Sequence, residues 1–292
     1  MKTLSLEVLH LPVALTSVLT IYNKVLEKIK GLTDITSCPS QRLIQHIHEN
    51  VRETLSKMTL HKDLQESEGE IIANVVYSMV INPEPLILQA FPAKAGWPFP
   101  VYKGGCGRTV VEDFVGRTLA EYEDAPWPVR ANLARQLIEM AQILTENSLD
   151  FALYLTDVNT NNFAVNADQK VVLVDAENII IVDRLQVRKE KPHGWSKPYT
   201  NDVIGCLDCL SFSPEDLCAH DLADHNYYAI CAGILAPDAY YSSRNGFLHG
   251  IPPHIDLQTN LSHLVKECAH PTSQFNRFLI VPRTFTQTNK PT

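Results

Sequence analysis

The 292-residue sequence predicts an α+β fold, and three observations indicate it. Apolar residues recur at helical spacing in the first third of the chain and again from Pro128 to Asn147. Elsewhere, short runs rich in β-branched and aromatic residues are bounded by glycine, proline and asparagine. With 45% hydrophobic residues, the chain can bury a core in one two-lobed domain or in two small ones.

Three helices are predicted in the first third. Residues 1–30 form the first helix, which ends at Gly31. The second, within residues 38–58, places five apolar residues on one face: Leu43, Ile44, Ile47, Val51 and Leu55. The third runs from Glu68 to Ile81. It stops before the Asn82–Pro85 run because a proline disfavours helical geometry in the residue before it.

The first helix has a second interpretation, since an apolar stretch after Met1 and Lys2 is typical of a secretory signal sequence. Glu7, His10 and Pro12 interrupt the stretch and no small-x-small cleavage site follows it, so we favour an amphipathic helix. No other window approaches the roughly 18 apolar residues of a membrane-spanning helix, and no transmembrane span is expected.

The period changes after Pro85, first in the run LILQAF and then over residues 98–116. Two β-rich runs in the latter stretch flank Gly104–Gly107, which predicts a hairpin with a tight turn at the glycines. A phosphate-binding loop is the alternative. We favour the turn because no Gly-Lys-Ser/Thr follows and the Gly-x-Gly-x-x-Gly spacing is missing.

The helix predicted at Pro128–Asn147 leads into a polar stretch between β-rich runs. Asp157 follows FALYL, Asn162 precedes FAV, and Asp175 follows VVLV. Phosphoryl transfer needs a carboxylate that orients the attacking hydroxyl and at least two oxygen ligands for a divalent metal. The three residues can supply this set if the strands bring them together. The alternative is a polar loop, since Asp and Asn are common turn residues.

At these residues the sequence resembles protein kinases. Leu155-Thr156-Asp157 is similar to the His-Arg-Asp triplet, and Asp175-Ala176-Glu177 resembles a divergent Asp-Phe-Gly. The resemblance implies that Asp157 is the catalytic base and that Asn162 and Asp175 hold Mg²⁺ or Mn²⁺ on ATP. It also implies a hinge after the hairpin, where the residues expected to contact the nucleotide are Glu112, Asp113 and Phe114.

The resemblance extends to one family, the divergent protein kinase domain family in its deleted-in-autism branch, over roughly residues 36–280. The motifs that carry it are CPSQRL, NPEPLILQAFP, GWPF, APW, FALYLTDV, NFAV, VDAEN, LSFS and DHNYYAIC. It implies a protein-kinase-like two-lobed fold with a mostly helical C-lobe. It also implies a protein of the Golgi and secretory route, including a secreted one that acts outside the cell.

The chain departs from the kinase pattern at its N-lobe. No glycine-rich strand pair and no strand with a phosphate-anchoring lysine precede residue 68, because Lys24, Lys28 and Lys30 lie in a helical pattern. Glu68 and Glu70 are the candidates for the glutamate that pairs with this lysine. We therefore expect an incomplete N-lobe and an alternative or truncated amino terminus.

The catalytic motifs depart less. The His-Arg region of the kinase motif is replaced here by Tyr154, Leu155 and Thr156. The replacement removes the basic residue that binds a phosphate on the activation segment. Ala176 and Glu177 replace Phe-Gly but leave the metal ligand Asp175. Asp224 has two interpretations of equal weight, an ordinary helix cap or the kinase aspartate that holds the catalytic-loop backbone.

Seven cysteines favour an oxidising compartment: Cys38, Cys106, Cys206, Cys209, Cys218, Cys231 and Cys268. Four of them lie between residues 206 and 231 and are the disulfide candidates: Cys206, Cys209, Cys218 and Cys231. A zinc site using His220 is the alternative, which we disfavour because the second half of the motif is irregular. Asn260, in Asn-Leu-Ser, is the glycosylation candidate.

Charge excludes one class of partner. The net charge is -8, and the 25 Lys and Arg residues are scattered rather than grouped, so nucleic acid is not an expected partner. The expected partner is a protein substrate or a cell-surface receptor that the sequence does not identify.

Three regions are expected: an N-terminal helical segment at 1–35, a partial N-lobe with hairpin and hinge at 36–115, and a C-lobe with the cysteine cluster at 116–292. The predicted function is that of a catalytically impaired kinase-like protein, or pseudokinase, that signals or binds as a secreted or Golgi protein. The alternative is an active secretory-pathway kinase.

Overall fold

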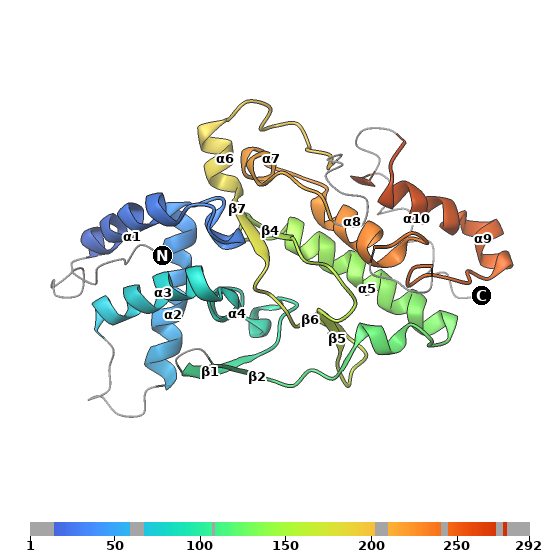
Figure 1. Ribbon diagram of the computed structural model, residues 1–292, viewed down its shortest axis with the longest axis horizontal. Coiled ribbons are helices and arrows are strands. Elements are labelled where there is room, and N and C mark those ends of the chain that lie inside the picture. Colours follow the sequence, from blue (N-terminus) through green and yellow to red (C-terminus); the bar gives the residue numbers. More distant parts are fainter. Residues whose placement is uncertain are drawn as a thin grey trace. The chain divides into compact units, whose positions relative to one another are not determined.

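A computed structural model describes residues 15–58, 67–106, 109–201, 210–240, 245–272 and 277–278 (Figure 1). The chain divides into two compact units, Met1–Phe114 with Ala176–Asn178, and Val115–Asp175 with Ile179–Thr292. Helices dominate and small antiparallel sheets accompany them in both units, so the α+β prediction is confirmed.

Three helices of the first unit agree with the sequence-based expectations over the described residues. They are α1 (Leu15–Ile29), α2 (Gln41–Met58) and α3 (Glu68–Ile81), with a short 3-10 turn at Asp34–Thr36. Residues 1–14 of the first predicted helix, and with them the signal-sequence alternative, lie outside the described residues. The predicted apolar face of α2 is buried at four of its five positions, and Leu55 is half-buried. Ser67 and Glu70 form a capping box at the start of α3, in which each side chain bonds the other's backbone N–H.

The run LILQAF is helical, contrary to the change of period that predicted extended structure. It lies in α4 (Glu84–Ala90), which is followed by a 3-10 turn at Ala93–Ala95. Pro85 stands in the first turn of α4, where its missing N–H costs nothing, and Asn82 Oδ1 accepts the Glu84 N–H. Leu86–Ala90 are all buried, and a short, fully buried run has no period that separates a strand from a helix.

The predicted hairpin is present, but its glycines are not all in the turn. β1 (Tyr102–Cys106) pairs antiparallel with β2 (Thr109–Glu112), with Gly104 opposite Val111 and Gly105 opposite Val110. Gly104 has φ of +154° beside a register irregularity, a backbone conformation that residues with a Cβ rarely adopt. Gly107, the rest of the predicted turn, lies outside the described residues.

The second unit begins with β3 (Arg117–Thr118), a 3-10 turn at Leu119–Tyr122 and the long helix α5 (Trp127–Thr145). Pro128 lies in the first turn of α5, as predicted. The apolar residues that recur at helical spacing along this helix include five that are all buried: Leu133, Leu137, Met140, Ala141 and Leu144. This helix is the core element of the unit.

Two small sheets follow. β4 (Phe151–Leu155) pairs antiparallel with β7 (Ile179–Asp183), and Figure 1 shows these strands side by side. β5 (Phe163–Val165) lies between β3 and β6 (Val171–Leu173). All residues of β4, β5 and β7 are buried. The three β-rich runs around the predicted carboxylate site are therefore strands.

The rest of the second unit is mainly helical. The elements are α6 (Arg184–Glu190), α7 (Pro214–Ala219), α8 (His225–Ile230), a π-helical turn (Cys231–Leu235), α9 (Pro253–Thr259) and α10 (Leu261–Ala269). The motif DHNYYAIC, which begins at Asp224, thus leads into α8 and the turn after it.

A disulfide joins Cys231 to Cys268 and so links the π-helical turn to α10. Cys268 was not among the four disulfide candidates, because no local spacing points to a partner 37 residues away. Cys218 and Cys38 are also disulfide-bonded. The candidates Cys206 and Cys209 lie outside the described residues.

Asn260, the glycosylation candidate, is exposed between α9 and α10 and has φ of +54°. The hydroxyl of Ser262 donates to Asp256 Oδ2 at 2.7 Å, and the Ser262 N–H donates to Oδ1 at 2.8 Å. These bonds lower the pKa of Asp256. The sequon therefore sits in a fixed turn with its asparagine toward solvent.

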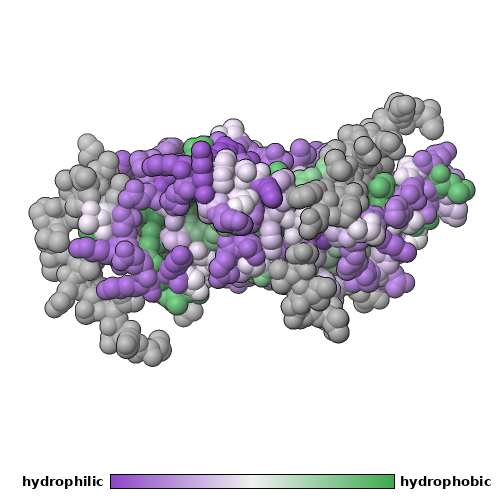
Figure 2. All heavy atoms as spheres, turned by 90° about the horizontal axis from the view of Figure 1, so that it is seen from above, coloured by the Kyte–Doolittle hydropathy of each residue, from purple (hydrophilic) through white to green (hydrophobic). Residues whose placement is uncertain are grey.

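The described helices differ from membrane-spanning helices in length or apolar character. None of them alone is long and apolar enough to cross a membrane, whereas α3 and Glu84–Ala95 pass together as a pair bent by 119°. On the face drawn in Figure 2, hydrophilic side chains cover most of the described surface, and hydrophobic ones form small separate areas.

Candidate metal and phosphate site

The loop after β4 is held by its own asparagines. Asn159 Nδ2 donates to Asp157 Oδ1 at 3.3 Å, and Asn162 Nδ2 donates to the Asp157 carbonyl at 3.2 Å. The second bond uses the amide nitrogen of Asn162 and leaves Oδ1 as its free acceptor, the atom that a cation would bind. The two predicted site residues are therefore in contact.

The pairing of β5 with β6 brings the backbone of Asp175 close to that of Asn162. Phe163 lies opposite Leu173 in the β5–β6 pair, and the Val174 N–H donates to the Asn162 carbonyl at 2.8 Å. Asp175 is the next residue along the chain. Asn162 is buried, whereas Asp157 and Asp175 are half-buried. The strands therefore bring the backbones of the three predicted residues together and leave both carboxylates access to solvent.

This set suits a hard divalent cation. Two carboxylates and one amide oxygen are the ligands that Mg²⁺ prefers, with water and phosphate oxygens for the other positions. Within the described ranges, no group of three or more His, Cys, Asp or Glu side chains could hold a metal ion, and the candidate set here has two carboxylates and one amide. Cys218, a member of the alternative zinc motif, is disulfide-bonded, and His220 Nδ1 bonds the Asp216 carbonyl at 2.7 Å.

The strand that leads to Asp157 is anchored by two residues that sequence reasoning missed. Asn226 Oδ1 accepts the Leu155 N–H at 2.9 Å, and its Nδ2 donates to the Leu153 carbonyl and to Thr145 Oγ1, both at 2.9 Å. His225 Nε2 donates to the Leu155 carbonyl at 2.7 Å. Both residues are fully buried at the start of α8.

Asp224 holds a different part of the unit. Its side chain makes no capping bond to α8. Asp224 Oδ1 accepts the Asn201 N–H, and Oδ2 pairs with Arg277 Nη1, each at 2.8 Å. Asp224 is nevertheless the N-cap residue of α8, and its carbonyl accepts the Tyr228 N–H at 3.0 Å, so it caps the helix through its backbone and not through its side chain. His225 and Asn226 bond the backbone of Leu155, the first residue of the triplet that resembles the kinase catalytic loop.

The buried His225 is expected to make the stability of the fold sensitive to acid. Burial lowers its pKa to about 4, partly opposed by the bond to Leu155 and reinforced by the Arg277 charge. In the unfolded chain His225 has its ordinary pKa of 6.5, so between pH 6.5 and pH 4 it binds a proton in the unfolded state but not in the folded state. The free energy of unfolding therefore falls as the pH drops through this range. At 1.36 kcal/mol per pKa unit, we expect a loss of up to about 3 kcal/mol.

Urea unfolding at pH 7.5 and pH 4.5 checks this expectation for the full chain and for His225→Gln. The variant lacks the titrating group, so its stability should depend less on pH in this window, whatever its stability at pH 7.5. Equal pH dependence of the two proteins would contradict it.

The two candidate glutamates of the N-lobe have other partners. Glu68 Oε1 bonds His48 Nε2 at 2.6 Å, and His48 Nδ1 in turn bonds the buried Tyr22 hydroxyl at 2.9 Å. Glu70 closes the capping box with Ser67. Neither carboxylate makes an ion pair with a lysine in the part of the chain that the structure describes.

Glu84 makes a contact that the sequence did not indicate. Its Oε1 accepts the Ala176 N–H at 3.0 Å. Ala176 follows Asp175 directly, and the Ala176–Asn178 segment belongs to the first unit together with Glu84. A carboxylate at the start of α4 therefore fixes the backbone next to the metal-ligand candidate.

The predicted hinge residues end the first unit. Glu112 is the last residue of β2. The Asp113 N–H donates to the Val101 carbonyl at 3.0 Å, and its carboxylate pairs with Lys103 at 3.0 Å. Phe114 is 91% exposed, the largest exposed fraction among the apolar residues described as exposed. A contact of these residues with a nucleotide stays a prediction.

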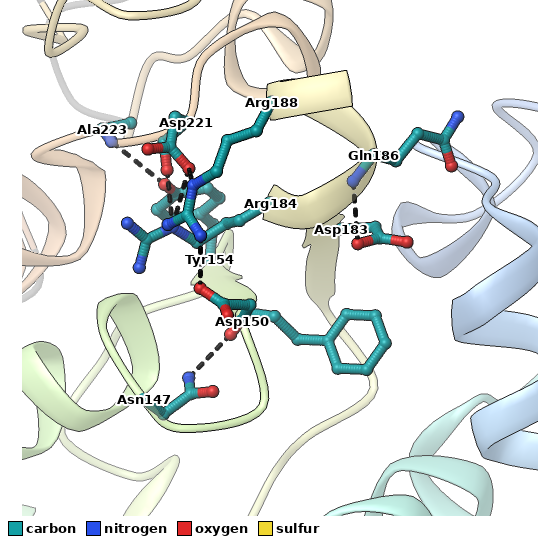
Figure 3. Close-up of polar contacts among 10 residues, drawn as sticks. Asn147, Asp150, Tyr154, Asp183, Arg184, Gln186, Arg188, Asp221 and Ala223 are labelled. Carbon is teal, nitrogen blue, oxygen red and sulfur yellow. Dashed lines mark hydrogen bonds and ion pairs between the residues drawn. The ribbon is translucent and has the colours of Figure 1, made fainter. Parts of the chain in front are cut away.

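An arginine network holds the opposite end of β4 (Figure 3). Arg184 and Arg188 extend from α6 to Asp221 Oδ1, at 3.2 and 2.8 Å, and Arg188 also pairs with Asp150 at 2.8 Å. Beside them the Ala223 N–H donates to the buried Tyr154 hydroxyl, whose pKa burial raises. The site strand is therefore fixed at both ends.

Comparison with known proteins agrees with this geometry. A helical second unit with a carboxylate loop between β4 and β5 and a second carboxylate after β6 defines a protein-kinase-like protein. The family model described as the protein-kinase domain of FAM69 matches residues 76–271. The chain belongs to this divergent kinase family, as the motif resemblance predicted.

The relatives are divergent protein kinase domain proteins. Divergent protein kinase domain 2A of Homo sapiens is 42% identical over 257 residues, which cover 86% of this chain and 59% of that protein, and the Mus musculus protein gives the same values. Divergent protein kinase domain 2B of Homo sapiens is 29% identical over 180 residues, 61% of this chain and 40% of that protein. The chain thus spans 59% of the length of its 2A relatives.

Proposed function

We propose that this chain is a kinase-like signalling or binding protein of the secretory pathway in which phosphoryl transfer is impaired. The observation that carries the proposal is that Glu68 bonds His48 and Glu70 bonds Ser67, and that within the described ranges neither carboxylate pairs with a lysine that could hold the phosphates. A fixed positive charge and backbone donors supply most of the stabilisation of the transferred phosphoryl group. Without that charge the metal ligands alone support little catalysis.

The secretory assignment has two supports. The Cys231–Cys268 disulfide, with bonded Cys38 and Cys218, is typical of an oxidising compartment. Asn260 is exposed in a sequon, as glycosylation requires. The partner on this proposal is a protein, as a substrate or as a cell-surface receptor.

A second candidate function, an active secretory-pathway kinase, is favoured by the Asp157–Asn162 contact and by the strand pairing that brings Asp175 beside Asn162. In that case Asp157 accepts the proton of the substrate hydroxyl, and Asn162 and Asp175 hold Mg²⁺ or Mn²⁺. The metal, when bound, neutralises charge that develops on the phosphate oxygens.

A thermal-shift titration with ATP and Mg²⁺ or Mn²⁺ separates the two candidates. A ligand at one hundred times its Kd stabilises by about 2.7 kcal/mol, so binding gives a measurable rise in Tm. The impaired protein is expected to show no metal-dependent rise at millimolar ATP. A rise that needs metal and is lost in Asp175→Ala would favour the active kinase.

A further inference from the structure

The first unit contains a cavity that the proposed phosphate site does not use. Its volume is about 690 Å³, within the range of small-molecule sites. Helices α2, α3 and α4, the hairpin and Glu177 form its walls, and none of Asp157, Asn162 and Asp175 lines it. The apolar part of the wall includes Val51, Val75, Ile81, Leu86 and Val110.

Polar groups with spare bonding capacity also face this cavity. Gln89 is 7% exposed, and its Nε2 donates to the Pro85 carbonyl, which leaves Oε1 with no partner among the described residues. Asn82 uses its Oδ1 on the Glu84 N–H, so its Nδ2 is available. Gln89 Oε1 is not among the buried atoms that lack a hydrogen bond, so it is accessible and can accept a bond from a ligand.

Glu177 supplies the charge. It stands where the kinase motif has glycine, so the departure from Asp-Phe-Gly places a carboxylate on the cavity wall. The bond from Ala176 N to Glu84 Oε1 fixes the adjacent backbone and so limits the positions open to Glu177. Among the described lining residues there is no Lys, Arg or His, and Glu177 is the one carboxylate.

We propose that this cavity binds a cationic ligand with an apolar body, in which an amidinium, guanidinium or ammonium group pairs with Glu177 and donates to polar groups such as Gln89 Oε1. The described lining disfavours phosphate-bearing ligands, since its one carboxylate repels anions and no cation among the described lining residues offsets it. A planar fork of N–H donors matches a carboxylate in two parallel bonds. A small amine and an arginine side chain of a peptide share this chemistry.

Calorimetric titration of the purified full chain with three probes of similar shape tests whether the cavity prefers a cation. The probes are cationic benzamidine, neutral benzamide and anionic benzoate. Benzamidine is expected to bind, and benzoate is not. Glu177 is exposed, so Glu177→Gln is expected to weaken benzamidine binding by about threefold to fivefold, the upper range of an exposed ion pair. Glu215→Gln, at an exposed carboxylate of α7, is the matched control and is expected to leave binding unchanged.

The tripeptide acetyl-Leu-Arg-Leu-amide distinguishes the two sources of the cation. Tighter binding than benzamidine assigns the cavity to a basic peptide, and weaker binding assigns it to a small amine. Asn162→Ala, which alters the proposed metal site, should not change either titration, so this test is independent of the proposed function. Binding of benzoate as strong as that of benzamidine, no binding of either cation, or an unchanged Glu177→Gln would overturn the proposal.

Discussion

Asp224→Ala is expected to destabilise the protein by about 3–5 kcal/mol, because it leaves Arg277 as a buried charge without its carboxylate. Asp224 is 0% exposed and Arg277 is 2% exposed. The guanidinium also donates to the carbonyls of Asn201, Cys268 and Ala269, at 2.6 to 3.0 Å, and lies over the Tyr228 ring. These bonds hold the guanidinium in place when the carboxylate is removed.

Denaturant unfolding of the purified variant measures this loss. The matched control is Asp238→Ala, which removes a carboxylate paired with His270 at the surface, where both side chains are more than half exposed. Exposed pairs contribute about 1 kcal/mol or less, so this variant should unfold close to the unchanged protein. Similar losses for Asp224→Ala and Asp238→Ala would refute the buried-pair interpretation.

Asn226→Leu is expected to lower the free energy of unfolding by about 2–6 kcal/mol. Leucine has a similar size but bonds nothing, so the Leu155 N–H and the Leu153 carbonyl would lose the Asn226 bond, whereas the Thr145 hydroxyl keeps its bond to the Ala141 carbonyl. Each buried group left without a partner costs about 1–3 kcal/mol. Because β4 leads to Asp157, the variant should also speed amide exchange in the loop that follows the strand.

Unfolding and hydrogen exchange together check this prediction. Asn132→Leu is the control, since Asn132 is exposed on α5 and bonds the Arg135 side chain. Surface substitutions of this kind change stability by about 0.5 kcal/mol or less. If Asn226→Leu behaves like this control, the anchoring of β4 by Asn226 is wrong.

Local signals predicted much of the fold. The bounds of α3 follow from a Ser–Glu capping box and from prolines after Asn82, and the face of α5 follows from its period. The strands around Asp157, Asn162 and Asp175 were predicted from short β-rich runs. These features depend on residues within a few positions of one another.

Contacts between distant parts of the chain escaped prediction. Asn226 bonds a strand 71 residues away, and Glu84 bonds Ala176 across 92 residues. Cys268 forms a disulfide with Cys231 across 37 residues, and no local spacing of cysteines in the sequence indicates this pair. α4 was missed because tertiary burial, rather than periodicity, decides the structure of a short apolar run.

We propose above that the chain keeps kinase-type metal ligands but transfers phosphate poorly. The most direct test is transfer of the labelled γ-phosphate of ATP, with Mg²⁺ and with Mn²⁺, to a generic protein substrate and to the chain itself. Asp157→Asn is the matched control. Phosphate transfer by the unchanged protein and by Asp157→Asn is expected to stay at the background of the assay. Metal-dependent transfer by the unchanged protein that Asp157→Asn abolishes would contradict it.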